Sequence, residues 1–141
     1  MDYSIEYDLD DIGELASTLV QKADSKVLLF YGEMGVGKTT LIKSMVKSMG
    51  GHVSATSPTF SLVNEYPVKD DLVYHFDFYR INDPLEALDI GFEDYLGSGH
   101  WIFIEWPDII EVLLPDEVVK IFLNQGKNRS RALDLELVNS N

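Results

Sequence analysis

The chain contains no cysteine. Disulfide bonds and thiolate metal sites are therefore excluded, and the composition fits the reducing cytoplasm. No apolar run approaches the roughly 18 residues of a membrane-spanning helix. The acidic start, Met1 to Glu6, lacks the apolar core of a secretory signal peptide. We therefore expect a cytoplasmic protein that makes no use of a membrane.

Basic residues are also scarce. There are 11 lysines and arginines against 24 aspartates and glutamates, which gives a net charge of −13. A protein that holds nucleic acid by itself normally presents a basic patch. We therefore do not expect this chain to be the main nucleic-acid binder of its system. The charge fits either a basic protein partner or a solubilising acidic surface.

One stretch carries most of the chemical information. The apolar run Val27 to Tyr31 leads into a glycine-rich segment that matches G-x-x-x-x-G-K-[ST], with Gly32, Gly37, Lys38 and Thr39 in the fixed positions. Such a loop wraps backbone N–H groups around a phosphate, and the following helix points its positive end at the same anion. Lys38 would reach the β- and γ-phosphates, and the Thr39 hydroxyl would be a ligand of Mg²⁺.

Two later acids each follow an apolar, strand-like run. Asp77 follows Leu72 to Phe76, and Glu105 ends the run from His100. Open α/β sheets place ligand chemistry at the carboxyl ends of their strands. Glu105 is the strongest candidate for the Walker-B acid on the magnesium side, the alternative being a capping or salt-bridged acid. Asp77 would either reach Mg²⁺ through water or orient a hydrolytic water.

The remaining pattern predicts one α/β domain, residues 1–141. We expect a P-loop NTPase-like three-layer sandwich with a mostly parallel central sheet and antiparallel edge strands. Besides the helix after the phosphate loop, a helix is predicted over residues 11–22, with Asp11 and Glu14 as its capping box, and another begins after Asp83. Residues 132–138 alternate as an antiparallel strand at a sheet edge.

Two further features have two readings each, and a third has one. The hydroxyl-rich loop that contains Ser57, Pro58 and Thr59 either senses a γ-phosphate or is a plain surface loop. Arg80 pairs with a phosphate or makes a surface ion pair, and the ion pair is the more common case. His75, inside an apolar strand, is expected to be a packed histidine with satisfied nitrogens.

Four motifs in order resemble one family. They are the phosphate loop Gly32 to Thr40, Ser57-Pro58-Thr59-Phe60 with Tyr66, His75-Phe76-Asp77, and Glu105-Trp106-Pro107. This combination over nearly the whole chain resembles the TsaE family, small bacterial ATPases required for threonylcarbamoyl modification of adenosine next to the tRNA anticodon. Where the family often has Asp after the first loop glycine, this chain has Glu33, and we attach no functional change to that difference.

The resemblance implies slow hydrolysis of ATP with Mg²⁺, used to reset a complex of TsaD and TsaB between turnovers. In that complex tRNA would be contacted only indirectly by this chain. Thr39 and Glu105 would hold the metal, Asp77 would serve hydrolysis, and Trp106 would matter for activity or assembly. The resemblance also places Ser57 and Thr59 in a switch-like loop and Glu6 and Arg129 near the adenosine. The phosphates would be wrapped by Gly35, Val36, Gly37, Lys38, Thr39 and Thr40.

Two other function classes compete with a helper ATPase. A small-molecule P-loop kinase needs cationic clamps on the transferred phosphoryl group, and the chain has three arginines, Arg80, Arg129 and Arg131. A GTP-dependent regulatory module would be expected to carry an Asn-Lys-x-Asp guanine motif, which the sequence lacks. Both classes fit the sequence less well than a helper ATPase does.

Overall fold

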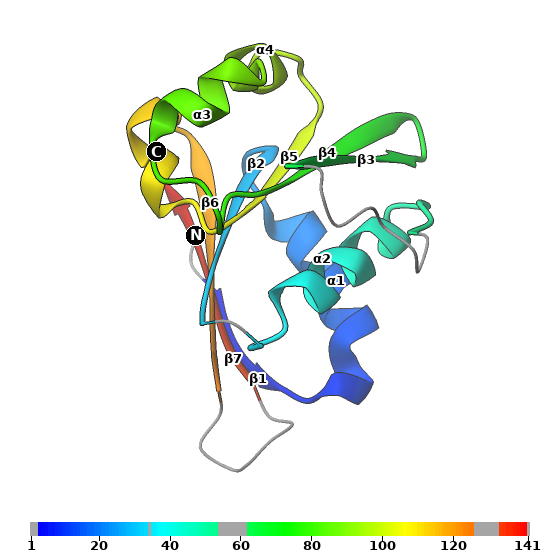
Figure 1. Cartoon of the computed structure of the whole chain (residues 1–141). Helices are drawn as coiled ribbons and strands as arrows, with labels where there is room; N and C mark the ends of the chain where they lie inside the picture. The colour runs from blue at the N-terminus through cyan, green and yellow to red at the C-terminus, as the bar shows by residue number, and fades with distance from the viewer. Residues whose placement is uncertain (1–2, 34, 54–61, 126–132, 141) are drawn as a thin grey trace.

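The chain folds around a central β-sheet with helices on both of its faces (Figure 1). The computed structural model describes residues 3–33, 35–53, 62–125 and 133–140. The strands are β1 (Tyr3–Tyr7), β2 (Val27–Tyr31), β3 (Val63–Val68), β4 (Asp71–Asp77), β5 (Trp101–Glu105), β6 (Val118–Gln125) and β7 (Leu133–Ser140). The α-helices are α1 (Ile12–Lys22), α2 (Lys38–Ser48), α3 (Pro84–Asp89) and α4 (Phe92–Leu96), and the 3-10 helices are η1 (Leu9–Asp11) and η2 (Asp108–Leu113).

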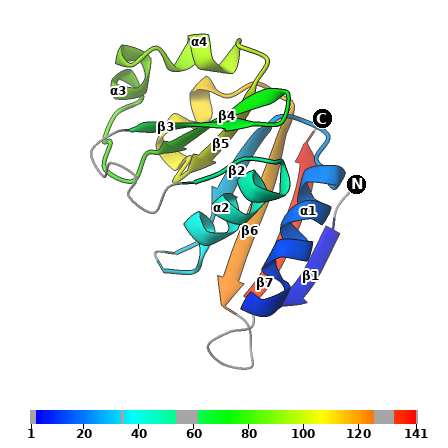
Figure 2. The ribbon, with the colours of Figure 1, turned by 90° about the vertical axis from the view of Figure 1, so that its right-hand side faces the viewer.

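Within the described residues these strands form one seven-stranded sheet in the order β1-β7-β6-β2-β5-β4-β3. The four strands β6, β2, β5 and β4 are parallel, whereas β1, β7 and β3 join through antiparallel pairs. The fold class predicted from the sequence is therefore confirmed. The expected edge position of the last strand is wrong, because β1 pairs along Tyr3–Tyr7 on the outside of β7 (Figure 2). Alternation along a single strand indicates pairing but does not reveal which strand lies outermost.

The alternation of side chains along the central strands produces two separate cores. Leu28 and Phe30 belong to the core under α1 and α2, where they lie with Leu41 of α2. Leu29, between them in sequence, belongs to the opposite core with Phe92 of α4. Successive side chains of a strand point to opposite faces, so β2 is covered on both sides. This is why the run from Val27 reads as continuously apolar.

The helix starts agree only partly with the sequence patterns. Asp83 caps α3 by accepting from the Leu85 N–H, which confirms the predicted helix start, and Glu86 completes a capping box that was not predicted. The capping box expected at Asp11 is wrong, because Asp11 makes no side-chain cap hydrogen bond to α1. Asp8 caps instead, by accepting from the Asp10 N–H at the start of η1. A run of several acids offers more than one capping residue, and the preceding 3-10 turn moves the cap upstream.

The parallel strands bring the predicted functional residues to one edge of the sheet. In the register of β4 against β5, Asp77 lies opposite Glu105, and in that of β2 against β5, Phe30 lies opposite Glu105. The loop that follows β2 leads directly into α2, which begins at Lys38. The phosphate-binding pattern and both acids therefore meet at the carboxyl edge of the sheet.

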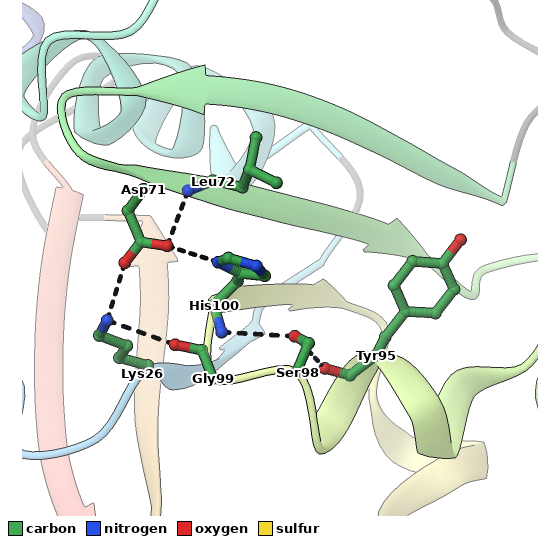
Figure 3. A network of polar contacts seen from close by, with 7 residues as sticks. All are labelled: Lys26, Asp71, Leu72, Tyr95, Ser98, Gly99 and His100. Carbon is green, nitrogen blue, oxygen red and sulfur yellow. Dashed lines mark hydrogen bonds and ion pairs between the residues drawn. The ribbon is translucent and has the colours of Figure 1, made fainter.

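The opposite edge is held together by an ionic network (Figure 3). The Asp71 carboxylate at the start of β4 accepts from Lys26 Nζ at 2.7 Å and from His100 Nδ1 at 2.6 Å. Lys26 Nζ also donates to the Gly99 carbonyl at 3.3 Å. These contacts hold the pKa of Asp71 well below its usual range. The network joins the starts of β2, β4 and β5.

Replacing Asp71 by asparagine is expected to lower the free energy of unfolding by about 1 kcal/mol at neutral pH. Because the folded pKa is depressed, this stabilisation is fully present above the unfolded pKa of about 4 and is lost progressively as the pH falls from there through the lower folded pKa. Urea unfolding at pH 7 and pH 3 measures the difference. Asp70→Asn in the same turn is the control, since it removes an equal charge at an exposed position. A loss that is the same at both pH values would contradict the ionic origin.

Candidate functional site

The phosphate-loop segment is shaped by two of its glycines. A Cβ on Gly32, whose φ is +154°, would come within 2.8 Å of the Leu123 carbonyl oxygen of β6. Gly37 takes the left-handed region, with φ of +104°, at the N-cap of α2. Side chains are disfavoured at both places, by contact at Gly32 and by backbone strain at Gly37. The loop can therefore turn tightly between β2 and α2.

Lys38 is buried at the first position of α2, and its side chain folds back over the loop. Its Nζ donates to the Gly32 carbonyl at 2.6 Å and lies 3.4 Å from the centroid of the Trp106 ring. Burial lowers the pKa of Lys38, while the carboxylates of Glu105, Asp77 and Asp108 oppose that shift. Lys38 therefore places a positive charge between the loop backbone and the acids at the ends of β4 and β5.

Thr39 and Glu105 are in direct contact. The Thr39 Oγ1 lies 3.0 Å from each of the two Glu105 carboxylate oxygens. Glu105 is buried, with 4% of its surface exposed, whereas Thr39 is exposed at the start of α2. The threonine of the phosphate-binding pattern and the predicted Walker-B acid, 66 positions apart in the chain, are thus brought together.

Asp77 and Trp106 lie beside this pair. Asp77 is exposed, and its Oδ1 accepts from the backbone N–H of Tyr79 at 3.0 Å. Trp106 directly follows Glu105 and takes a left-handed backbone with φ of +56°, which is uncommon for a bulky residue. Its ring packs at 4.8 Å from that of Tyr79. The strained backbone of Trp106 therefore lies directly beside Glu105, and backbone strain of this kind is often found at functional sites.

The sequence missed the partners of His75. The histidine is satisfied, as expected, but by functional neighbours: its Nε2 lies 2.6 Å from Glu105 Oε2 and its Nδ1 lies 3.1 Å from the Tyr66 hydroxyl. The available signal was the strand period. Residues 75 and 77 share one face of β4, and Asp77 had already been assigned to the site.

The other predicted residues lie beside the loop, away from it, or outside the described residues. Glu6 is exposed on β1, which runs parallel to β2 but is separated from it by β7 and β6, so its place near an adenosine stays a prediction. Thr40 is exposed and Val36 half-buried, both next to the loop. Ser57, Thr59 and Arg129 lie outside the described residues, and their roles stay predictions.

One carboxylate and one hydroxyl of the site could hold a magnesium ion together with phosphate. No group of three or more His, Cys, Asp or Glu side chains that could hold a metal occurs in the described parts of the chain. Mg²⁺ is usually bound by one or two carboxylates together with substrate phosphates and water. A single carboxylate beside a loop hydroxyl fits that mode of binding.

The fold and the strand–loop–helix at its carboxyl edge define an α/β protein of the P-loop NTPase-like class. A family model described as "Threonylcarbamoyl adenosine biosynthesis protein TsaE" matches residues 7–133. The chain belongs to this TsaE family, as the resemblance of its four motifs predicted. Across the described residues, the helices are all too short or too polar to cross a membrane.

Curated relatives carry the same description. The "tRNA threonylcarbamoyladenosine biosynthesis protein TsaE" of Haemophilus influenzae is 35% identical over 105 residues, which cover 73% of this chain and 66% of that protein. The protein of the same name from Bacillus subtilis is 31% identical over 127 residues, covering 90% of this chain and 78% of the relative. A crystal structure titled "Bacillus subtilus YdiB" matches the fold with a TM-score of 0.74 at 22% identity, over 100% of this chain and 88% of the other.

Proposed function

We propose that the chain binds ATP with Mg²⁺, hydrolyses it slowly, and thereby serves threonylcarbamoyl modification of tRNA adenosine as a helper subunit. The observation that carries the proposal is the contact of Thr39 Oγ1 with both oxygens of Glu105 at 3.0 Å, beside a glycine-rich loop. The names of its relatives support the pathway, since they place TsaE proteins in tRNA threonylcarbamoyladenosine biosynthesis.

The loop residues would bind the nucleotide by its phosphates. Backbone N–H groups at the start of α2 are available to phosphate oxygens, because the first turn of a helix leaves its N–H groups unpaired. Lys38 would exchange the Gly32 carbonyl for a phosphate oxygen, which is the stronger, charge-assisted acceptor. Thr39 and Glu105 would hold Mg²⁺, which when bound supplies charge neutralisation on the phosphates.

Asp77 would act on water. It is exposed, and it lies opposite the buried Glu105 in the register of β4 and β5. A carboxylate open to solvent beside the phosphate-binding residues can accept a hydrogen bond from a water and orient it toward the γ-phosphate.

The charge supports a protein-mediated connection to tRNA. At a net charge of −13 the chain is poorly suited to hold a polyanion. We propose that TsaD and TsaB contact the tRNA and that ATP hydrolysis by this chain, in the cytoplasm, resets their complex between turnovers. The chain would then act on a protein surface, and its nucleotide state would decide when the complex is released for the next cycle.

Reconstitution tests this proposal. TsaD and TsaB with tRNA, threonine, bicarbonate and ATP are expected to stop near one modification per transferase without the chain and to continue through repeated cycles with it. Modified nucleoside released from the tRNA is measured by liquid chromatography over time. Repeated cycles at the same rate without the chain would overturn the proposed role. A Lys43→Ala chain, altered at an exposed position of α2, should support cycling as the wild type does.

A further inference from the structure

A chain of polar contacts approaches Glu105 from the side away from the phosphate loop. It begins at Tyr66 on β3, passes through His75 on β4, and ends at the carboxylate on β5. We infer that Tyr66 and His75 are positioning residues. They hold the Glu105 carboxylate in the orientation in which it accepts from Thr39 and would bind Mg²⁺. The inference rests on the proposed ATPase function and assigns roles that the phosphate-binding motif does not contain.

The geometry is tight and buried. His75 Nε2 lies 2.6 Å from Glu105 Oε2, and the side chains of both residues are 5% exposed. Tyr66, 7% exposed, lies 3.1 Å from His75 Nδ1 through its hydroxyl. A buried carboxylate must be hydrogen-bonded to offset its lost hydration. His75 supplies that hydrogen bond to the Glu105 carboxylate.

The hydrogen-bond roles give one consistent direction. A carboxylate only accepts, so His75 Nε2 is the donor in its contact with Glu105. In the neutral imidazole the other ring nitrogen is then an acceptor, and the Tyr66 hydroxyl donates to it. Tyr66 thereby favours the tautomer that points a donor at Glu105. The same logic operates where a carboxylate or carbonyl fixes the ring of a metal-binding histidine.

The two carboxylate oxygens are used unequally. His75 contacts Oε2, whereas Thr39 is equally distant from Oε1 and Oε2. Oε1 therefore retains more of its acceptor capacity on the side of the phosphate loop. If His75 were lost, the carboxylate could rotate about its last bond, because terminal carboxylate torsions have broad minima. His75 thus holds Oε2 and leaves Oε1 as the freer acceptor, and Glu105 would hold Mg²⁺ in this fixed orientation.

The arrangement also explains why the histidine lies where it does. His75 is two residues before Asp77 on β4, so both side chains point to the face that carries α2. In the register of β4 and β5, His75 lies opposite Phe103 and Asp77 lies opposite Glu105. His75 thus contacts the residue two positions beyond its partner on the adjacent strand, a diagonal distance that long side chains span in a sheet.

Three variants test the inference. His75→Leu removes the donor, His75→Gln keeps an amide donor near the position of Nε2, and Tyr66→Phe removes only the hydroxyl. The measurement is the dissociation constant of ADP and of a non-hydrolysable ATP analogue, by calorimetry, in EDTA and in Mg²⁺. For each nucleotide, the ratio of the dissociation constant in EDTA to that in Mg²⁺ separates the magnesium contribution from nucleotide binding itself. Thermal unfolding of each variant reports its structural cost separately.

His75→Leu is expected to reduce the magnesium-dependent gain in affinity by about 10-fold, the lower limit typical for groups behind a metal ligand. His75→Gln should retain most of the gain, and Tyr66→Phe should lose roughly a third to two thirds of it. Affinity in EDTA should stay at the wild-type value in all three. Tyr74→Phe, a hydroxyl deletion on the neighbouring residue of β4, is the matched control and should leave the ratio unchanged.

The outcomes separate the two levels of the argument. A wild-type chain that binds no nucleotide would overturn the proposed function and the inference together. A wild type with a clear magnesium gain that all three variants share would overturn the inference alone. Equal losses in EDTA and in Mg²⁺ would also overturn it, because they would indicate a purely structural role. If His75→Leu fails to fold, His75→Gln and Tyr66→Phe are compared instead. A smaller magnesium gain in Tyr66→Phe supports the inference, and equal gains in the two variants overturn it.

Discussion

Replacing Lys38 by alanine is expected to weaken ATP binding about 100-fold and to remove measurable hydrolysis. The side chain already stands at the loop, where its Nζ donates to the Gly32 carbonyl at 2.6 Å. A charge-assisted hydrogen bond to a buried site contributes about 1.5–3 kcal/mol, and Lys38 would supply it to phosphates that carry several negative charges. The ATP-binding constant from calorimetry and the release of inorganic phosphate measure the two effects.

The fold itself should tolerate this change. Lys38→Ala removes a cation 3.4 Å from the Trp106 ring centroid, a contact worth about 1 kcal/mol or somewhat more. It also removes a buried charge whose burial disfavours the protonated form, and the two effects oppose each other. Lys43→Ala, an exposed lysine on the same helix, is the control and should bind ATP normally. Unchanged ATP binding by the Lys38 variant would show that the phosphate-loop assignment is wrong.

Glu105→Gln is expected to reduce ATP turnover by about two orders of magnitude, a loss similar to that of other preorganised charge-stabilising groups. The substitution keeps the size of the side chain but removes the charge that would hold Mg²⁺. It also presents an amide N–H₂ to Thr39 and His75, both of which donate to the wild-type carboxylate. Because Glu105 raises the pKa of Lys38, its loss should lower that pKa further.

The magnesium dependence of binding distinguishes this variant from a general loss of structure. Glu105→Gln should bind nucleotide in EDTA nearly as well as the wild type and gain little affinity when Mg²⁺ is added. Glu93→Gln, which neutralises an exposed acid on α4, is the matched control. Wild-type turnover with wild-type magnesium dependence in Glu105→Gln would assign the metal-side role to another residue.

The sequence predicts the centre of the sheet well because the signals there are local. The apolar run before Gly32, the glycine turn and the amphipathic segment after Lys38 lie within one continuous stretch, so pattern and structure agree. Asp77 and Glu105 could be placed because each ends an apolar strand, and parallel strands share a carboxyl edge. Contact between Thr39 and Glu105 follows from that rule.

Contacts between side chains on different strands could not be predicted from the sequence pattern. The contact of His75 with Glu105 depends on β4 lying beside β5, and the contact of Tyr66 with His75 depends on β3 lying beside β4. Neither adjacency is encoded in the alternation of a single strand. The position of Lys38 over Trp106 depends on a left-handed residue directly after β5, which propensity disfavours for tryptophan.

The position of β7 has a consequence for how the chain folds. In the described sheet β1 is paired with β7 alone, so the strand Tyr3–Tyr7 depends on the strand Leu133–Ser140 for its hydrogen bonds to the sheet. Contacts between residues more than a hundred positions apart form slowly, because the intervening chain must first be closed into a loop. We therefore expect β1 to join the sheet late in folding, and truncation of residues 133–140 should leave β1 without its partner while the strands from β6 to β3 remain contiguous.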